Sequence, residues 1–170
     1  MKLQFRHQKF QTDAANAICD VFAGQPFNSP TYMIDPGLGQ MGFDDALNFT
    51  GFNNAPVVIS DNIVLKNIRT IQQSGQIKPS EELFGRYNLT IEMETGVGKT
   101  YTYIKTMYEL NKRYGWSKFI IVVPSVAIRE GVYKSFQITE EHFAEDYGKK
   151  IRFFIYNSTA PSEIDRFASN

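Results

Sequence analysis

Residues 88–100 read Asn-Leu-Thr-Ile-Glu-Met-Glu-Thr-Gly-Val-Gly-Lys-Thr, and this stretch decides the predicted fold. Its first part alternates apolar and polar residues through Leu89, Ile91 and Met93, which predicts a strand over 88–93. Residues 100–114 carry apolar side chains at helical spacing and stop before a glycine, which predicts a helix. A glycine-rich loop over 94–100 therefore joins a predicted strand to a predicted helix. This is the context in which a phosphate-binding loop works.

Each residue type in this loop suits a nucleotide phosphate. Gly96 and Gly98 permit backbone shapes and a close approach that a Cβ would block, and the helix start adds unpaired amides. Lys99 can reach the β- and γ-phosphates, and the Thr100 hydroxyl can ligate a Mg²⁺ ion that bridges them, so these two are the predicted catalytic residues. The alternative is a glycine-rich turn without a ligand. The predicted cofactor-binding residues of the loop are Thr95, Gly96, Val97, Gly98, Lys99 and Thr100.

The rest of the second half continues the alternation of strands and helices. Residues 119–123 form an uninterrupted apolar run, as in a strand buried on both faces of a parallel sheet, and residues 151–156 read as a third strand. Helices are predicted over about 126–136 and from Thr139 onward. This order predicts an α/β domain with a mainly parallel sheet flanked by helices.

The first half is less regular. A helix is predicted over 12–23 with a stop at Gly24, and another after a cap at Ser60 or Asp61 that ends near Gly75. Residues 57–59 read as a short strand, whereas 25–56 are rich in Asn, Gly and Pro without a period and read as an insertion. The predicted organisation is an N-terminal helix over 1–24, an insertion and helix over 25–87, and the α/β part over 88–170.

Composition narrows the function classes. Hydrophobic residues make up 42% of the 170 residues and aromatic residues 14%, so a core can form and global disorder is excluded. Eighteen basic residues balance eighteen acidic ones, so any contact with DNA must be a local patch. Cys19 has no disulfide partner, and His7 and His142 do not form a Cys/His cluster at zinc-ligand spacing. The absence of a long apolar run predicts a cytoplasmic protein without a membrane segment.

Two further segments are candidates for ligand contacts. Ser125 precedes a predicted helix and Arg129 follows one turn later, so both could hold phosphates of nucleic acid, although a capped helix with a solvated arginine fits equally well. Phe10 and Gln11 resemble the glutamine motif that reads adenine. Gln8 is a near alternative, and a surface glutamine without a ligand is the simpler interpretation.

The glycine-rich loop has Met93 where the strict phosphate-loop pattern has glycine. This form of the loop resembles motif I of superfamily 2 helicases, and it argues against a small nucleotide kinase. Residues 88–104, 114–132, 153–158 and 163–169 together resemble the start of the Res subunit of type III restriction enzymes. The resemblance implies a RecA-like P-loop NTPase domain that uses ATP and Mg²⁺.

The resemblance also implies a partner and an activity. Res subunits translocate on double-stranded DNA, carry a second motor domain and a nuclease, and work with a methyltransferase (Mod) subunit as an ATP-dependent, site-specific deoxyribonuclease. No apolar strand ending in Asp-Glu follows the loop, so we expect this chain to be an N-terminal piece that by itself binds nucleotide at most weakly. The alternatives are a stand-alone NTPase or nucleotide kinase, and a non-enzymatic assembly module that uses residues 25–56 as its contact surface.

Overall fold

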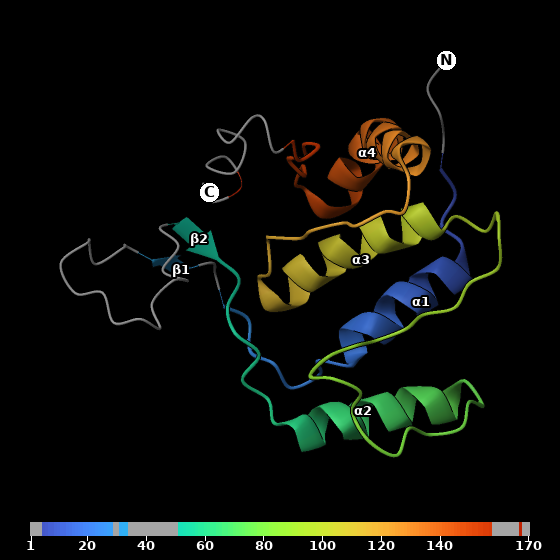
Figure 1. Ribbon diagram of the computed structural model, residues 1–170, viewed down its shortest axis with the longest axis vertical. Helices are drawn as coiled ribbons and strands as arrows, with labels where there is room; N and C mark the ends of the chain where they lie inside the picture. The colour runs from blue at the N-terminus through green and yellow to red at the C-terminus, as the bar shows by residue number, and fades with distance from the viewer. Residues whose placement is uncertain (1–4, 29–30, 34–50, 158–166, 168–170) are drawn as a thin grey trace.

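The computed structural model describes residues 5–28, 31–33, 51–157 and 167, and α-helices dominate this part of the chain. Figure 1 shows α3 between α4 and α1, with α1 separating α3 from α2. The strands β1 (Thr31–Met33) and β2 (Gly51–Asn53) pair antiparallel, with Thr31 opposite Asn53. The helices are α1 (Lys9–Asp20), α2 (Asp61–Ser74), α3 (Lys99–Tyr114) and α4 (Val126–Tyr147).

The helix boundaries follow sequence signals, with three differences, the first of which is that α1 ends at Asp20 and not at the predicted stop before Gly24. Glycines in the left-handed region end α3 and α4, with φ of 78° at Gly115 and 66° at Gly148. Helix α1 begins earlier than predicted, and Lys9 pairs with Asp13 at 2.6 Å across its first turn. The two helices predicted from 126 onward form one helix, because the Thr139 hydroxyl donates to the Ser135 carbonyl at 2.7 Å instead of capping a new helix.

Two apolar cores share α3. The first lies between α1, α2 and the C-terminal end of α3, and the second lies between α3 and α4. Because α3 contributes residues to both, it is the central element of the described structure. The first core includes Cys19, Phe22, Val64, Leu110, Tyr114 and Trp116, and the second consists of Ile104, Met107, Tyr108, Phe136 and Phe143.

Polar contacts fix α1 against α3. The Arg113 guanidinium donates to the Asp20 carboxylate and to the Asn16 amide oxygen, each at 2.6 Å. The Tyr114 hydroxyl donates to the Cys19 carbonyl at 2.8 Å. Cys19 itself is fully buried, and this burial raises the pKa of its thiol to about 12. The cysteine is therefore a neutral core residue.

The predicted α/β fold with a parallel sheet was wrong. Within the described residues, strands are confined to β1 and β2, and the segments 57–59, 88–93, 119–123 and 151–156 form none. Some of their apolar side chains pack on helices instead: Phe119 contacts both cores, and Phe153 stacks on Phe136 with ring centroids 4.8 Å apart. Others face solvent, since Val122 is 89% exposed. An apolar pattern indicates which side chains are expected to be buried. A β-strand also requires backbone hydrogen bonds to a neighbouring strand, and the pattern does not specify that strand.

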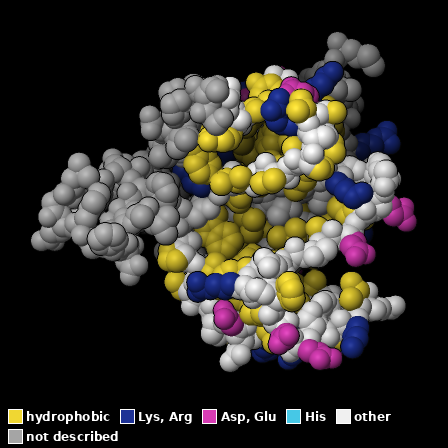
Figure 2. Space-filling model, viewed as in Figure 1, with side chains coloured by type: hydrophobic (Ala, Val, Ile, Leu, Met, Phe, Trp, Pro, Cys, Tyr) yellow, Lys and Arg dark blue, Asp and Glu magenta, His cyan; other side chains and the backbone are white. Residues whose placement is uncertain are grey.

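The irregular segment 119–122 borders a groove against α3. The groove has a volume of about 350 Å³, and its lining includes Tyr103 and Met107 of α3 together with Phe119. On the face of the molecule drawn in Figure 2, hydrophobic side chains gather in a hollow near the middle. None of the described helices combines the length and hydrophobicity needed to cross a bilayer.

Much of the predicted insertion over 25–56 lies outside the described residues. Its two ends meet at Gln25, a buried side chain that donates to the Pro56 carbonyl at 3.0 Å and accepts from the Val58 amide at 2.8 Å. Residues on both sides of the undescribed part also contact the end of α3 and the segment after it: the Asn28 amide donates to the Tyr114 carbonyl at 3.3 Å, and the Asn54 side chain donates to the Lys118 carbonyl at 2.7 Å.

Candidate functional site

The glycine-rich loop over 94–100 leads directly into α3. Gly96 and Gly98 both have positive φ, 82° and 87°, which L-residues rarely adopt, and Gly98 is the N-cap of the helix. The Thr102 amide donates to the Gly98 carbonyl at 3.0 Å, so the amides of residues 99–101 precede this hydrogen bond of the helix ladder. Such amides, together with the positive end of the helix dipole, suit an anion.

The cation of the loop is Lys99. Its Nζ donates to the Glu94 carbonyl at 2.8 Å, so the side chain connects the C-terminal end of the loop to its first residue. Lys99 is exposed, and Thr100 is half-buried in the first turn of α3. The structure thus brings an ammonium group, a hydroxyl and free amides to one end of one helix.

Gln11 lies against the same loop. It is buried in α1, and its Nε2 donates to the Val97 carbonyl at 2.9 Å. A Cβ on Gly98 would lie only 2.6 Å from this Nε2 atom. Gln8, the alternative, is exposed and precedes α1 as its N-cap. The structure therefore joins Gln11 to the loop, whereas its predicted contact with adenine stays a prediction.

Ser125 and Arg129 lie at the start of α4. The Ser125 hydroxyl caps the helix by accepting from the Ile128 amide at 3.3 Å. The Arg129 guanidinium lies 2.9 Å from the Glu130 carboxylate, and its side chain is 42% exposed. The capping role is confirmed, and contact with DNA stays a prediction.

Comparison with known proteins gives the family. A family model described as the res subunit of type III restriction enzymes matches residues 58–163, more than half of the chain. This chain belongs to that family.

The curated relatives agree with this assignment. Over 109 residues the chain is 36% identical to the Res subunit of the type III restriction-modification enzyme EcoP15I from Escherichia coli and to that of EcoPI from Escherichia phage P1. It is 45% identical over 62 residues to the Res subunit of StyLTI from Salmonella typhimurium. The first two alignments cover 62% of this chain but 11% of each relative, so the matched part is about a tenth of the relatives' length.

Within this Res-family chain, the family match includes the glycine-rich loop, Ser125 and Arg129, while Gln11 lies before it. The structure, and not the family match, therefore links Gln11 to the loop.

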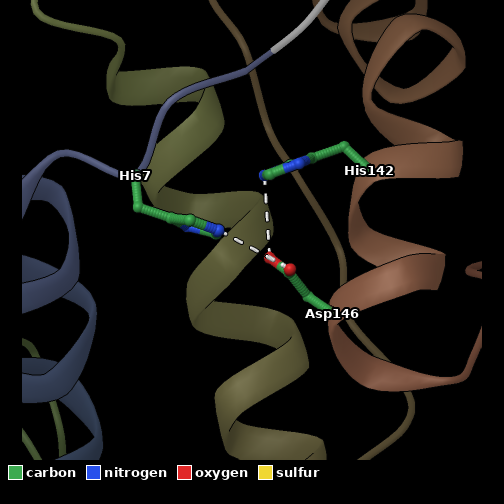
Figure 3. Close-up of side chains that lie close together, drawn as sticks. All are labelled: His7, His142 and Asp146. Atoms are coloured by element: carbon green, nitrogen blue, oxygen red, sulfur yellow. Dashed lines mark ion pairs between the residues drawn. The ribbon is translucent and has the colours of Figure 1, made fainter.

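One group of side chains was missed by sequence reasoning. His7, His142 and Asp146 of the Res-family chain converge, as Figure 3 shows, although His7 is far from the other two in the sequence. The sequence carries one signal, the spacing of four between His142 and Asp146, which puts both on one face of α4. The approach of His7 depends on how the segment before α1 packs, which no local pattern encodes.

Proposed function

We propose that this chain is the ATP-binding part of a Res subunit. The observation that carries the proposal is the glycine-rich loop, in which two glycines with positive φ lead into the N-terminus of α3 beside Lys99. Such a loop offers amides, a helix dipole and a mobile cation to a single polyphosphate.

Different residues of the site would contact different parts of the nucleotide. The loop amides and the first turn of α3 hold phosphate oxygens, and Lys99 exchanges its contact with the Glu94 carbonyl for the phosphate charge. A Mg²⁺ ion fits this donor set because the Thr100 hydroxyl is an oxygen ligand at the helix start, and the bound ion neutralises phosphate charge. Gln11 supports the loop through Nε2 and offers Oε1 to the adenine amino group.

The wider role follows from the family. We propose that the full-length protein is an ATP-dependent DNA translocase and site-specific deoxyribonuclease that acts in the cytoplasm on double-stranded DNA with a methyltransferase (Mod) subunit. Within it, residues 88–170 supply the phosphate and DNA contacts, including Ser125 and Arg129. Residues 1–24 support the loop through Gln11, and residues 25–87 hold the insertion and α2.

Calorimetric titration of the chain with ATP or ADP and Mg²⁺ tests the nucleotide site. A charge-assisted hydrogen bond contributes roughly 1.5–3 kcal/mol, so Lys99→Ala should weaken binding by about 10- to 150-fold. Lys66→Ala is the matched control, because Lys66 is an exposed lysine on α2, which α1 separates from α3. Equal affinities of the wild-type chain and Lys99→Ala would overturn the proposal.

A further inference from the structure

We infer that His7, His142 and Asp146 form a binding site for a divalent transition-metal ion of the Zn²⁺ type. The site is separate from the nucleotide loop, which none of the three residues belongs to. It goes beyond the proposed ATP-binding role and does not depend on it.

The distances between the ligand atoms suit such an ion. The Asp146 carboxylate lies between the two rings, with Oδ1 3.6 Å from His7 Nε2 and Oδ2 3.7 Å from His142 Nε2. All three ligand atoms lie within 4.8 Å of one another. Zinc bonds of roughly 2.0–2.2 Å place tetrahedral ligands about 3.3–3.5 Å apart. The two distances between carboxylate and imidazole must therefore shorten by a few tenths of an ångström, and the widest separation, which is at most 4.8 Å, by no more than about 1.5 Å. The observed separations exceed those of good hydrogen bonds.

The backbone fixes two of the ligands and leaves the third accessible. His142 and Asp146 are one turn apart on α4, so a helix holds their spacing. His7 comes from the segment before α1, and its side chain is 55% exposed, which leaves an approach from solvent. Figure 3 shows both rings directed at the carboxylate between them. A bound ion would therefore join the segment before α1 to α4.

The surroundings of His142 favour a ligating imidazole. The ring is held among aromatic neighbours, with centroids 5.3 Å from Phe5 and 5.1 Å from Phe143. The Tyr101 hydroxyl lies 2.8 Å from the same Nε2 atom, and it must turn aside when an ion binds.

The donor set selects the class of ion. Two imidazoles and a carboxylate suit Zn²⁺ and similar transition metals, whereas Mg²⁺ and Ca²⁺ prefer oxygen ligands alone. Three protein ligands leave a fourth position for water. The sequence contains two histidines, and both belong to this cluster. An ion that binds through imidazole therefore binds at this site.

Titration of the untagged chain with Zn²⁺ by calorimetry, and with Co²⁺ by its visible absorption, tests the inference. One ion per chain should bind, and His7→Ala and Asp146→Asn should each weaken binding at least about tenfold, since even partners outside the ligand set alter metal affinity by that factor. Glu145→Gln is the matched control, because it removes one negative charge from the neighbouring position of α4 without removing a ligand. Its affinity should equal that of the wild-type chain.

Further variants separate binding from folding and from the nucleotide site. His142→Ala would disturb the aromatic packing, so the decisive variant is His7→Ala, whose side chain is mostly exposed. Lys99→Ala should bind Zn²⁺ as the wild-type chain does, which keeps this inference distinct from ATP binding. Failure to bind one Zn²⁺ per chain, or unchanged affinity in His7→Ala, would overturn the inference.

Discussion

Gly96 and Gly98 share a left-handed backbone but have different surroundings. A Cβ on Gly96 would meet nothing within 4 Å, whereas a Cβ on Gly98 would lie 2.6 Å from Nε2 of Gln11. Comparing an alanine substitution at Gly96 with one at Gly98 therefore distinguishes the free-energy cost of backbone strain from the cost of displacing Gln11.

Alanine substitutions at the two glycines should destabilise the chain unequally. Gly96→Ala should cost about 1–2 kcal/mol, because the left-handed conformation is unfavourable for a residue with a Cβ. Gly98→Ala should cost about 1 kcal/mol more, since Gln11 must also give up its hydrogen bond to Val97. Urea unfolding measures both, and the extra cost should vanish in a Gln11→Ala background. Equal costs in the wild-type background would show that Gln11 moves aside freely.

At the scale of elements, Arg113 is the main polar link between α1 and α3. Besides Asp20 and Asn16 on α1, its guanidinium lies 3.4 Å from the Glu109 carboxylate one turn earlier on α3. The side chain is 31% exposed, so solvent screens part of this attraction.

Arg113→Ala should lower the free energy of unfolding by about 1–2 kcal/mol, because several charge-assisted hydrogen bonds are lost at a partly exposed position. Arg113→Lys should recover less than half of this, since an ammonium group cannot reproduce the guanidinium fork. Arg129→Ala is the control, because that guanidinium pairs with its exposed neighbour Glu130, and the change should stay within about 0.5 kcal/mol. Chemical denaturation that gave Arg113→Ala and Arg129→Ala the same stability would contradict the prediction.

Elements differ in how far the sequence predicted them. Helices α2 and α3 were predictable because helical spacing and glycine stops are local signals, and Gly75 and Gly115 follow these two helices as predicted. The strands were predicted wrongly, because pairing depends on a neighbour that the apolar run over 119–123 does not specify. The structure places the predicted loop residues Lys99 and Thr100 at the start of α3, and their contact with a nucleotide stays a prediction. His7 was not found, because its approach to α4 is a tertiary contact.

For the whole molecule, the zero net charge means that DNA cannot be attracted by a general positive field. The start of α4 offers a local site for a phosphate, since Ser125 is exposed there and the positive end of the helix dipole lies at this position. The chain aligns with only 11% of the first relatives, so DNA binding belongs to the proposal for the full-length protein.

In that protein, Arg129→Ala should weaken DNA binding similarly for all sequences and reduce the salt slope by about one unit, because a phosphate contact is lost. Nucleotide affinity should hardly change. DNA affinity measured across a salt series, with Lys66→Ala as the control, checks this. An unchanged slope and affinity would rule out the contact, and a loss confined to one DNA sequence would mean that Arg129 reads bases.

The place of α3 in both apolar cores makes its unfolding cooperative. A helix with a single packed face can detach while the rest of a protein stays folded, but α3 can detach only if residues such as Leu110 and Ile104 leave two cores together. The glycine-rich loop is continuous with α3 and is therefore anchored to a helix that packs in both cores. We therefore expect the N-terminal end of α3 to keep its orientation during local unfolding of segments that pack in a single core.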